Sequence, residues 1–444
     1  MLDIASKIKV GKSSAGLIKP EHFLCGPPDL LRHFHILFNG LIQHSYVPSE
    51  FLSGMITPII KDSQGDVSSP SNYRGITLSC LPAKLFEYVI QSKTGHLLET
   101  DELQFGFKGK TSTSHALYTL KSTVDYFNNK GSSVFVAFLD CTKAFDRMSH
   151  HSLFSKLIGR KFPLCFLMCL IFWYANMACC VKWGSAESRS FSIPLGIKQG
   201  GINSPDFFSC YVDGLVKILR DKKIGCKLYM IFLAIILFAD DMCLLAPTRS
   251  ALETLIAESA AYCDRLGLQF NPKKSLILVF SKKKTDITLL KPILLNNCII
   301  EYASSVKYLG VTIVSERGLS FSAIKEIQTF YRAANAILTI LNKPNEDVLM
   351  QLLYTNCVPI ISYACNVKVF SAQDMRDCNT AINNAIRKIF TFQRWESVRV
   401  LRDGFQMKSI YEIFQIACDK LQLSLATHPN SILRRIHSNT ELTL

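Results

Sequence analysis

The chain carries two hydrophobic patterns with different periods. Apolar residues at three- and four-residue spacing predict amphipathic helices, and short unbroken runs of β-branched and aromatic residues predict buried strands. The helical pattern occupies residues 29–47, 81–99, 113–131, 149–161, 204–221, 251–267 and the chain from about 320 onward. The strand pattern occupies residues 54–60, 132–140, 233–247, 275–281 and 305–314. The mixture predicts a fold of the α+β class.

One uncharged stretch, residues 162–181, has the length of a membrane span. Pro163 and Asn176 interrupt it, and Trp173 and Tyr174 lie at its middle rather than at its ends. Four cysteines and an alanine-rich end lower its hydrophobicity further. We therefore predict a buried helix followed by the strand CCVKW, and no membrane partner.

The segment LAIILFADDMCLLAP at 233–247 is strongly apolar, yet it contains two adjacent carboxylates, Asp240 and Asp241. Because burial of two like charges is costly, the segment predicts a strand, a two-residue turn and a second strand, with both aspartates at or near the hairpin tip. The predicted strand at 132–140 also ends on a carboxylate, Asp140. If these strands are neighbours in one sheet, the three carboxylates converge.

Converging carboxylates repel one another unless cations neutralise them. Mg²⁺, with Mn²⁺ as the alternative ion, binds such oxygen ligands together with substrate phosphates, and two ions about 3.5–4 Å apart promote in-line phosphoryl transfer. The competing interpretation is that each aspartate merely caps a helix or a turn. That interpretation suits an isolated Asp better than a pair between two apolar strands.

The charge balance agrees with a nucleic-acid partner. The 444 residues contain 50 Lys and Arg against 35 Asp and Glu, and the resulting net charge of +15 is spread along the chain. Such an excess suits a polyanion, with a solvated basic surface as the simpler alternative. The 16 cysteines are scattered, without a C-x-x-C pair or a secretory signal, which predicts a reducing intracellular compartment and gives no support to a zinc site.

Seven segments, in order, resemble the motifs of reverse transcriptases from non-LTR (LINE-type) retrotransposons. Those resembling the fingers are PIIKDSQGDVSSPSNYRGITLSCLPAKLFEYVI and QFGFKGKTSTSHAL. Those resembling the palm are LDCTKAFDRMSHHSLFSKL, GIKQGGINSPDFFSCYVDGL, ILFADDMCLLAP, GLQFNPKKS and VKYLGVTI. The resemblance covers at least residues 17–315 and implies a right-hand polymerase whose palm holds an antiparallel sheet. The implied domains are an N-terminal helical extension at 1–45, fingers and palm at 46–315, a helical thumb at 316–390 and a C-terminal helical extension at 391–444.

The resemblance also implies roles in chemistry. Asp140 and Asp240 would be the principal ligands of the two metal ions, with Asp241 as an auxiliary carboxylate. Lys274 would be the general acid for pyrophosphate, with Lys273 as the alternative.

Further roles concern the substrates. Phe145 would be a steric gate that excludes a 2′-hydroxyl, or else only a core aromatic residue. The other implied residues are Lys61 and Arg74 for the triphosphate, Gln199 and Gly200 for the nucleotide pocket, Ser204 and Pro205 for the start of the helix beneath the template, and Tyr308, Leu309 and Gly310 for the primer grip.

The implied function is RNA-directed DNA synthesis: transfer of dNMP from dNTPs to a DNA primer on an RNA template, for retrotransposition, in the nucleus or nucleocytoplasm. One alternative is a decayed or co-opted copy that binds RNA without polymerising, which the intact aspartates disfavour. Another is a basic scaffold, which the ordered motifs disfavour strongly. Asn203 departs from the family pattern, where leucine is usual, so template affinity is in question. Complete elements usually also encode an endonuclease, which we do not expect in this chain, and the oligomeric state has no signature.

Overall fold

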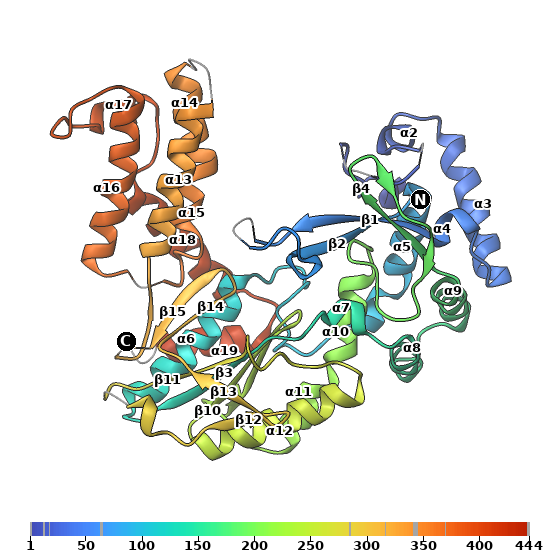
Figure 1. Ribbon diagram of the computed structural model, residues 1–444, viewed down its shortest axis with the longest axis horizontal. Coiled ribbons are helices and arrows are strands. Elements are labelled where there is room, and N and C mark those ends of the chain that lie inside the picture. Colours follow the sequence, from blue (N-terminus) through green and yellow to red (C-terminus); the bar gives the residue numbers. More distant parts are fainter. Residues whose placement is uncertain are drawn as a thin grey trace. The chain divides into compact units, whose positions relative to one another are not determined.

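The computed structural model describes residues 2–11, 14–16, 18–62, 65–283, 286–315, 317–340, 345–368 and 370–441. Positions 1, 17, 316 and 444, which bound segments expected from the sequence, lie outside these ranges. The chain forms two compact units, each built from separate stretches of sequence (Figure 1). Unit 1 comprises Met1–Phe107, Cys141–Asp221 and Glu258–Asn271, and unit 2 comprises Lys108–Asp140, Lys222–Ala257 and Pro272–Leu444. Both units contain helices and sheets, which confirms the α+β class.

A five-stranded sheet organises unit 1. Strand β1 (Ser53–Ile60) pairs antiparallel with β2 (Tyr73–Leu78) and parallel with β4 (Ala178–Trp183). Two short strands, β5 (Ala186–Glu187) and β6 (Phe191–Ser192), each pair antiparallel with β4. The helices of this unit are α1 (Leu2–Ala5), α2 (Pro20–Leu24), α3 (Pro28–His44), α4 (Ser49–Leu52), α5 (Leu81–Thr94), α7 (Ala144–Arg147), α8 (His150–Gly159), α9 (Leu164–Ala175), α10 (Ser204–Val212) and α11 (Gly214–Asp221), with 3₁₀ turns at Pro70–Asn72 and Gly95–Leu98.

The uncharged stretch at 162–181 forms α9 and then β4, as predicted, but α9 is buried on one face only, since Leu164 and Met168 are exposed. Trp173 of α9 is buried and stacks on Phe86 of α5, with ring centroids 5.9 Å apart. The ring of Phe86 also lies 5.2 Å from that of Phe38 in α3. The apolar character of α9 thus serves an aromatic core in unit 1, and none of the described helices is both long and apolar enough to cross a membrane.

The helix predicted at 204–221 is in fact two helices, α10 and α11, which are interrupted at Asp213. The Asp213 carboxylate accepts hydrogen bonds from the Arg160 guanidinium at 2.6 Å and from the Asp101 N–H at 2.7 Å. Its side chain is therefore fixed by distant partners at the point of interruption. The prediction of one continuous helix was therefore wrong at Asp213, although this residue keeps right-handed helical backbone angles.

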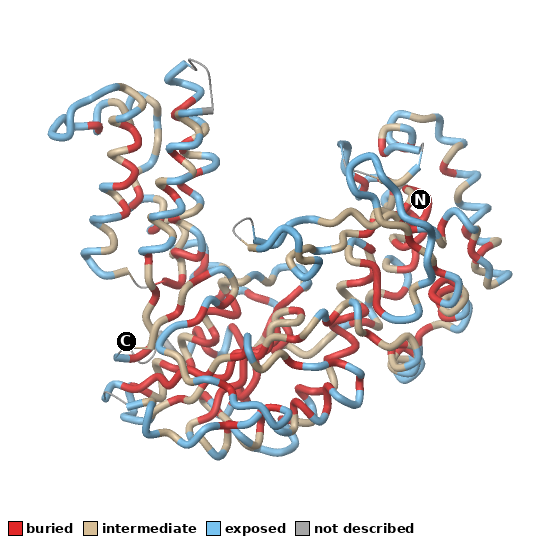
Figure 2. Tube along the Cα trace, in the orientation of Figure 1, coloured by how far each residue is buried: buried red, intermediate tan, exposed pale blue. Residues whose placement is uncertain are grey.

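Unit 2 contains a six-stranded sheet of order β12-β13-β11-β3-β10-β9. Its strands are β3 (Val134–Leu139), β9 (Ile235–Phe238), β10 (Asp241–Ala246), β11 (Leu276–Phe280), β12 (Ile293–Leu295) and β13 (Cys298–Tyr302). Every residue of β10 after Asp241 is buried, and helix α6 (Thr113–Asn129) packs against β3 and β9 (Figure 2). Smaller elements are β7 (Lys227–Leu228), β8 (Ile231–Phe232) and a 3₁₀ turn at Ile287–Leu289, and α12 (Arg249–Arg265) begins in unit 2 and ends in unit 1.

The single strand predicted at 305–314 is instead a hairpin. Strands β14 (Ser305–Tyr308) and β15 (Val311–Ser315) pair antiparallel, and β15 also pairs with β16 (Leu319–Phe321). The two residues between β14 and β15 have left-handed backbone angles, with φ of 46° at Leu309 and 80° at Gly310. A continuous β-branched pattern does not show such a turn, whereas the motif resemblance did imply one here.

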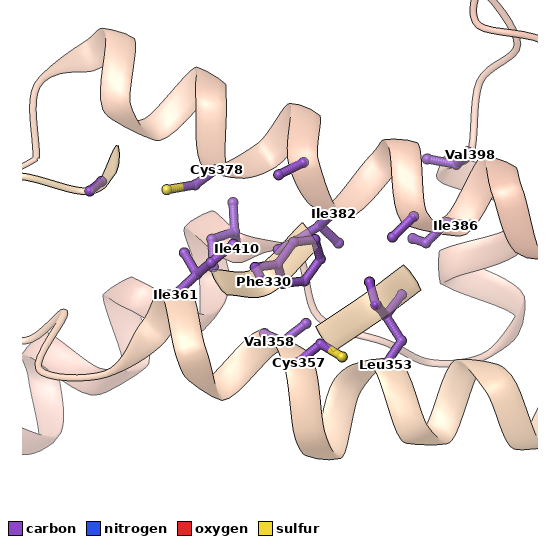
Figure 3. Close-up of a cluster of buried hydrophobic side chains, with 14 of the residues drawn as sticks. Phe330, Leu353, Cys357, Val358, Ile361, Cys378, Ile382, Ile386, Val398 and Ile410 are labelled. Carbon is purple, nitrogen blue, oxygen red and sulfur yellow. The ribbon is translucent and has the colours of Figure 1, made fainter. Parts of the chain in front are cut away.

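A helical bundle follows, as predicted from the periodicity beyond residue 320. It comprises α13 (Ile324–Ile340), α14 (Glu346–Leu352), a π-helical turn at Leu353–Cys357, α15 (Val358–Ser362), α16 (Ala372–Ile389), α17 (Arg399–Gly404) and α18 (Ile410–Ala426), and α19 (Ser431–Glu441) packs on α6 and α18. Figure 3 shows Phe330, Ile361, Ile382 and Ile410 pointing toward one another from four of these helices. This shared core joins the helices of the bundle into one packed body.

Candidate active site

The strand register of unit 2 brings two of the predicted aspartates to the same edge of the sheet. Strands β3 and β10 are antiparallel neighbours, and Leu139 lies opposite Met242. Asp140 directly follows Leu139, and Asp241 directly precedes Met242. The prediction that the two strand systems are antiparallel neighbours in one sheet is confirmed, but the sheet as a whole is mixed, because β11 and β13 pair parallel.

The third aspartate lies in the turn between β9 and β10. Phe238 pairs with Asp241, so the two turn residues are Ala239 and Asp240. Ala239 has a φ of 57°, which is uncommon for a residue with a side chain. Backbone strain of this kind clusters at functional sites, where the surrounding structure holds it in place. The tip is therefore Ala239–Asp240, with Asp241 already in the strand.

The three carboxylate residues differ in exposure from their neighbours. Asp140, Asp240 and Asp241 are half-buried, although the strand residues beside them are mostly buried. Partial exposure avoids most of the desolvation cost of a buried carboxylate and leaves oxygen atoms accessible to a cation. The apolar run is thus compatible with its charged residues because these lie where the strands end.

A cationic turn lies beside Asp140. Strand β11 pairs with β3 on the side away from β10, with Leu276 opposite Phe138. The Asp140 N–H donates to the Ser275 Oγ at 3.2 Å, which fixes the start of β11 next to the end of β3. Lys273 and Lys274 immediately precede Ser275, and both are exposed. The structure therefore places the turn that carries both candidate proton donors next to the end of β3, and the choice between the two lysines stays open.

The donor set suits a hard divalent cation, since it offers carboxylate oxygens from adjacent strand ends. Within the described residues, no group of three or more His, Cys, Asp or Glu side chains is arranged to hold a metal ion as it stands. The fit rests on the chemistry and the strand register of Asp140, Asp240 and Asp241.

In unit 1, Gln199 and Gly200 lie directly against strand β2. The Thr77 N–H donates to the Gln199 carbonyl at 2.7 Å, and the Gln199 Nε2 donates to the Asp146 carboxylate at 2.8 Å. Gly200 has a φ of 120°, and a Cβ there would lie 2.8 Å from the Thr77 carbonyl oxygen. Glycine is required at this position by both the backbone angle and the close approach.

The same loop is also held by Glu87 of helix α5, a residue that the sequence did not lead us to predict. The buried Glu87 carboxylate of α5 accepts the Ile202 N–H at 2.7 Å, and the Asn203 side-chain amide donates to the Glu87 carbonyl at 3.1 Å. Burial raises the pKa of Glu87, and the nearby Lys198 ammonium opposes this shift. In the sequence, the signal that could have identified Glu87 was a charged residue on the apolar face of a predicted helix. At Asn203, where the resemblance led us to expect leucine, the side chain forms a hydrogen bond with the backbone of α5.

A pocket of about 330 Å³ opens beside this loop. It is lined by Ile56 of β1, by Gly75 and Thr77 of β2, by Cys179 of β4, and by the segment 193–199. Asp146, which accepts the Gln199 amide, also lines it. The loop that carries Gln199 therefore forms one wall of a largely apolar cavity within unit 1.

Two cationic candidates lie on the β1–β2 hairpin. Lys61 directly follows β1, and its Nζ donates to the Ser71 carbonyl at 2.9 Å. Arg74 lies in β2 opposite Ile59. Both side chains are exposed, so they are accessible to an anionic substrate.

Phe145 lies in the short helix α7 and is half-buried. Its ring stacks on that of buried Phe208 at 4.7 Å, with an interplanar angle of 14°, and meets the ring of Phe107 edge-on at 6.2 Å. Aromatic contacts on two sides restrict the ring, while part of it stays accessible. Both the steric gate and the core interpretation predict contacts of this kind, so the choice between them requires the test given below.

The last group of candidates lies at the β14–β15 turn. Tyr308 is buried, and its ring lies 5.0 Å from that of Phe138 in β3, two residues before Asp140. Burial raises the pKa of Tyr308 well above its usual range, with smaller contributions from Cys243 and Asp241. The turn is therefore packed directly against the strand that carries the first catalytic candidate.

The chain is similar to known proteins of one family. Residues 60–313 match the family described as reverse transcriptase (RNA-dependent DNA polymerase). The Pol polyprotein of the type-1 retrotransposable element R2 of Nasonia vitripennis is 27% identical over 284 residues, which cover 62% of this chain and 27% of that protein. The probable RNA-directed DNA polymerase from transposon BS of Drosophila melanogaster is 24% identical over 435 residues, which cover 92% of this chain and 46% of that protein.

A third relative, the RNA-directed DNA polymerase from mobile element jockey of Drosophila funebris, is 22% identical, with 98% of this chain and 48% of that protein covered. This chain thus spans about half the length of these relatives, or less. Among solved structures, apo telomerase from Candida tropicalis has a TM-score of 0.47 and 10% identity, with 93% of this chain and 74% of that chain covered. Because the family match covers more than half of the chain, the chain belongs to the reverse transcriptase (RNA-dependent DNA polymerase) family, and its relatives are those of the non-LTR (LINE-type) retrotransposons that its motifs resemble.

Proposed function

We propose that the chain is an RNA-directed DNA polymerase that transfers dNMP from a dNTP to the 3′-hydroxyl of a DNA primer on an RNA template, in the course of retrotransposition. The observation that carries the proposal is the register of β3 and β10, which sets Asp140 and Asp241 at the same end of adjacent strands, next to the Asp240 turn. Residues 46–315 would be the fingers and palm, and residues 316–390 the thumb.

In the proposed mechanism, the chemistry takes place in unit 2 and involves its three carboxylates and the cationic turn that carries Lys273 and Lys274. Asp140, Asp240 and Asp241 would hold two Mg²⁺ ions, which supply charge stabilisation at the attacking and leaving oxygens. Lys274, or Lys273, would give a proton to the departing pyrophosphate. Because the Asp140 N–H donates to the Ser275 Oγ, the cationic turn is held next to the end of β3.

The residues of unit 1 would select and orient the substrate. Lys61 and Arg74 would bind the triphosphate, since both are exposed cations on one hairpin. Gln199 would contact the nucleotide from a loop whose backbone is fixed to β2, and Phe145 would exclude ribonucleotides by the rigidity of its stacked ring.

Primer extension tests the proposal directly. The wild-type chain, given a poly(A) template, an oligo(dT) primer, dTTP and Mg²⁺, should extend the primer, and omission of Mg²⁺ should stop extension. If the wild-type chain binds the hybrid but never extends the primer, the polymerase proposal is wrong and the RNA-binding alternative replaces it.

A further inference from the structure

One side chain of the helical bundle reaches the β14–β15 turn. The Tyr363 hydroxyl lies 3.1 Å from the Leu309 carbonyl oxygen and 3.0 Å from the Thr113 Oγ1, and Thr113 is the first residue of α6. A phenol that donates its one proton to the carbonyl can still accept a proton from the threonine. Both contacts are therefore satisfied together, and all three residues belong to unit 2.

The turn is one that needs external support. Leu309 and Gly310 both have positive φ, and hairpins of this type favour Asn, Asp or Gly rather than leucine at the first position. A Cβ on Gly310 would lie 3.0 Å from the Cε1 of the Tyr363 ring, so the ring rests directly on the glycine backbone. Tyr363 thus touches the strained turn twice, through its ring and through its hydroxyl.

Tyr363 is itself attached to a packed body. Ile361, two residues earlier, is buried in the core of the bundle (Figure 3), and Cys365, two residues later, is buried as well. The neighbouring contact from the Ser114 Oγ to the Asn366 Oδ1, at 3.0 Å, ties the same segment to α6. Movement of the bundle would therefore be transmitted to the side chain of Tyr363.

On its other side, the turn is connected to Asp140 through the ring contact between Tyr308 and Phe138. Tyr308 precedes the turn and packs on Phe138, and Phe138 lies two residues before Asp140 in β3. The contacts form one path from the core of the bundle, through Tyr363 and the turn, to the strand that ends at Asp140. The non-covalent steps of the path are the contacts of Tyr363 with the turn and of Tyr308 with Phe138, the other steps follow the backbone, and all of them lie within unit 2.

We propose that Tyr363 is a positioning residue, which holds the Leu309–Gly310 turn in its strained conformation and thereby fixes the primer end relative to Asp140. The proposal rests on the proposed polymerase function and on a primer contact at this turn. Tyr363 does not touch reacting atoms. Its effect on catalysis would come from the geometry of the turn, and small displacements of reacting groups have large effects on rate.

The test compares two conservative variants. Tyr363→Phe removes only the hydroxyl and keeps the ring, whereas the control Ser114→Ala removes the neighbouring bond between the same segments without touching the turn. We expect Tyr363→Phe to raise amide hydrogen exchange at residues 309–312 and to lower kcat about tenfold, with the KM for dNTP and the melting temperature unchanged. Ser114→Ala should leave the exchange of the turn and kcat at wild-type values.

The outcomes separate this inference from the proposed function. Failure of the wild-type chain to extend a primer would overturn the polymerase function itself. An active wild type together with wild-type kcat in Tyr363→Phe would overturn the positioning role, whether or not exchange at the turn had changed. A fall in kcat that appeared equally in Ser114→Ala would also overturn it, because the effect would then belong to the whole segment rather than to the turn.

Discussion

Asp240 occupies the turn of a hairpin whose strands are mostly buried, yet it is itself half-buried. At the scale of single residues, this contrast is the strongest indication of chemistry in the chain. A carboxylate held at a strained turn beside two others raises the electrostatic energy of the protein without cations.

The first prediction concerns Asp240→Asn. Asn is nearly isosteric but carries no charge, so the variant should lose primer extension by orders of magnitude, because stabilisation of the attacking and leaving oxygens depends on the metal site. Its melting temperature without Mg²⁺ should equal or exceed that of the wild type, since one repelling charge is gone.

Asp241→Asn is the matched control and should have a milder effect if its role is auxiliary. Primer extension and thermal melting, each with and without Mg²⁺, measure both variants. Near wild-type extension by Asp240→Asn would show that the turn is not the catalytic centre, and a much lower melting temperature would show that the pair is structural.

The second prediction concerns Phe145→Val. The stacked ring of Phe145 would exclude a 2′-hydroxyl, so its truncation should lower the preference for dNTP over rNTP about tenfold or more. Extension with dNTPs should persist, because the metal ligands are untouched. Single-nucleotide incorporation with paired dNTP and rNTP substrates measures the ratio, and an unchanged ratio would leave Phe145 as a packing residue only.

At the scale of elements, the start of α6 is joined to the segment between α18 and α19 by two histidines. The rings of His115 and His428 lie 4.6 Å apart in an edge-on arrangement. The His115 Nδ1 accepts the Ser112 N–H at 3.1 Å, and the His428 Nε2 lies 2.8 Å from the Lys110 carbonyl oxygen. These contacts are compatible with a neutral His115 ring.

The third prediction follows from this pair. Burial, with a contribution from His428, lowers the pKa of His115 to about 4 from its usual 6.5. The unfolded chain therefore binds a proton at a higher pH than the folded chain, and stability should fall as the pH drops from 6.5 toward 4. The expected loss is on the order of 1 kcal/mol between pH 6.5 and pH 5.

Thermal melting between pH 7 and pH 4.5 measures this loss. His115→Asn retains an acceptor for the Ser112 N–H but does not titrate, so its stability should depend less steeply on pH than that of the wild type. Equal slopes for the two proteins would contradict the assignment of the effect to His115.

At the scale of the whole molecule, the positive charge is the feature that concerns binding. A net charge of +15 is spread along the sequence rather than concentrated in one tail. Lysines and arginines that neutralise phosphates release condensed counterions, so binding to nucleic acid weakens as salt rises.

The fourth prediction is that affinity for an RNA–DNA hybrid falls by about 10³-fold or more between 50 and 200 mM salt, which corresponds to six or more phosphate contacts. Fluorescence anisotropy with a labelled hybrid measures it. Asp240→Asn should show the same salt dependence, because it alters chemistry rather than backbone contacts. An affinity that stayed constant with salt would exclude a phosphate-dominated interface.

The sequence by itself determined the elements whose formation depends on local pattern. Strand β3, helix α6 and the Ser149 cap of α8, which accepts the Ser152 N–H, lie where the periodicity and the capping residue predicted them. The ordered motifs also determined the family and the candidate carboxylates. These features are readable because neighbours within a few residues decide backbone conformation and the choice of buried face.

Only the tertiary structure decided which residues act on one another across long separations. The register of β3 against β10, the anchoring of Ile202 by Glu87, and the support of Leu309 by Tyr363 join residues from 54 to more than 100 positions apart. In the last two cases the partner is a backbone N–H or carbonyl, which any residue presents. Because a backbone group does not depend on the side chain of its residue, no pattern in the sequence predicts the hydrogen bond, and only the folded chain shows it.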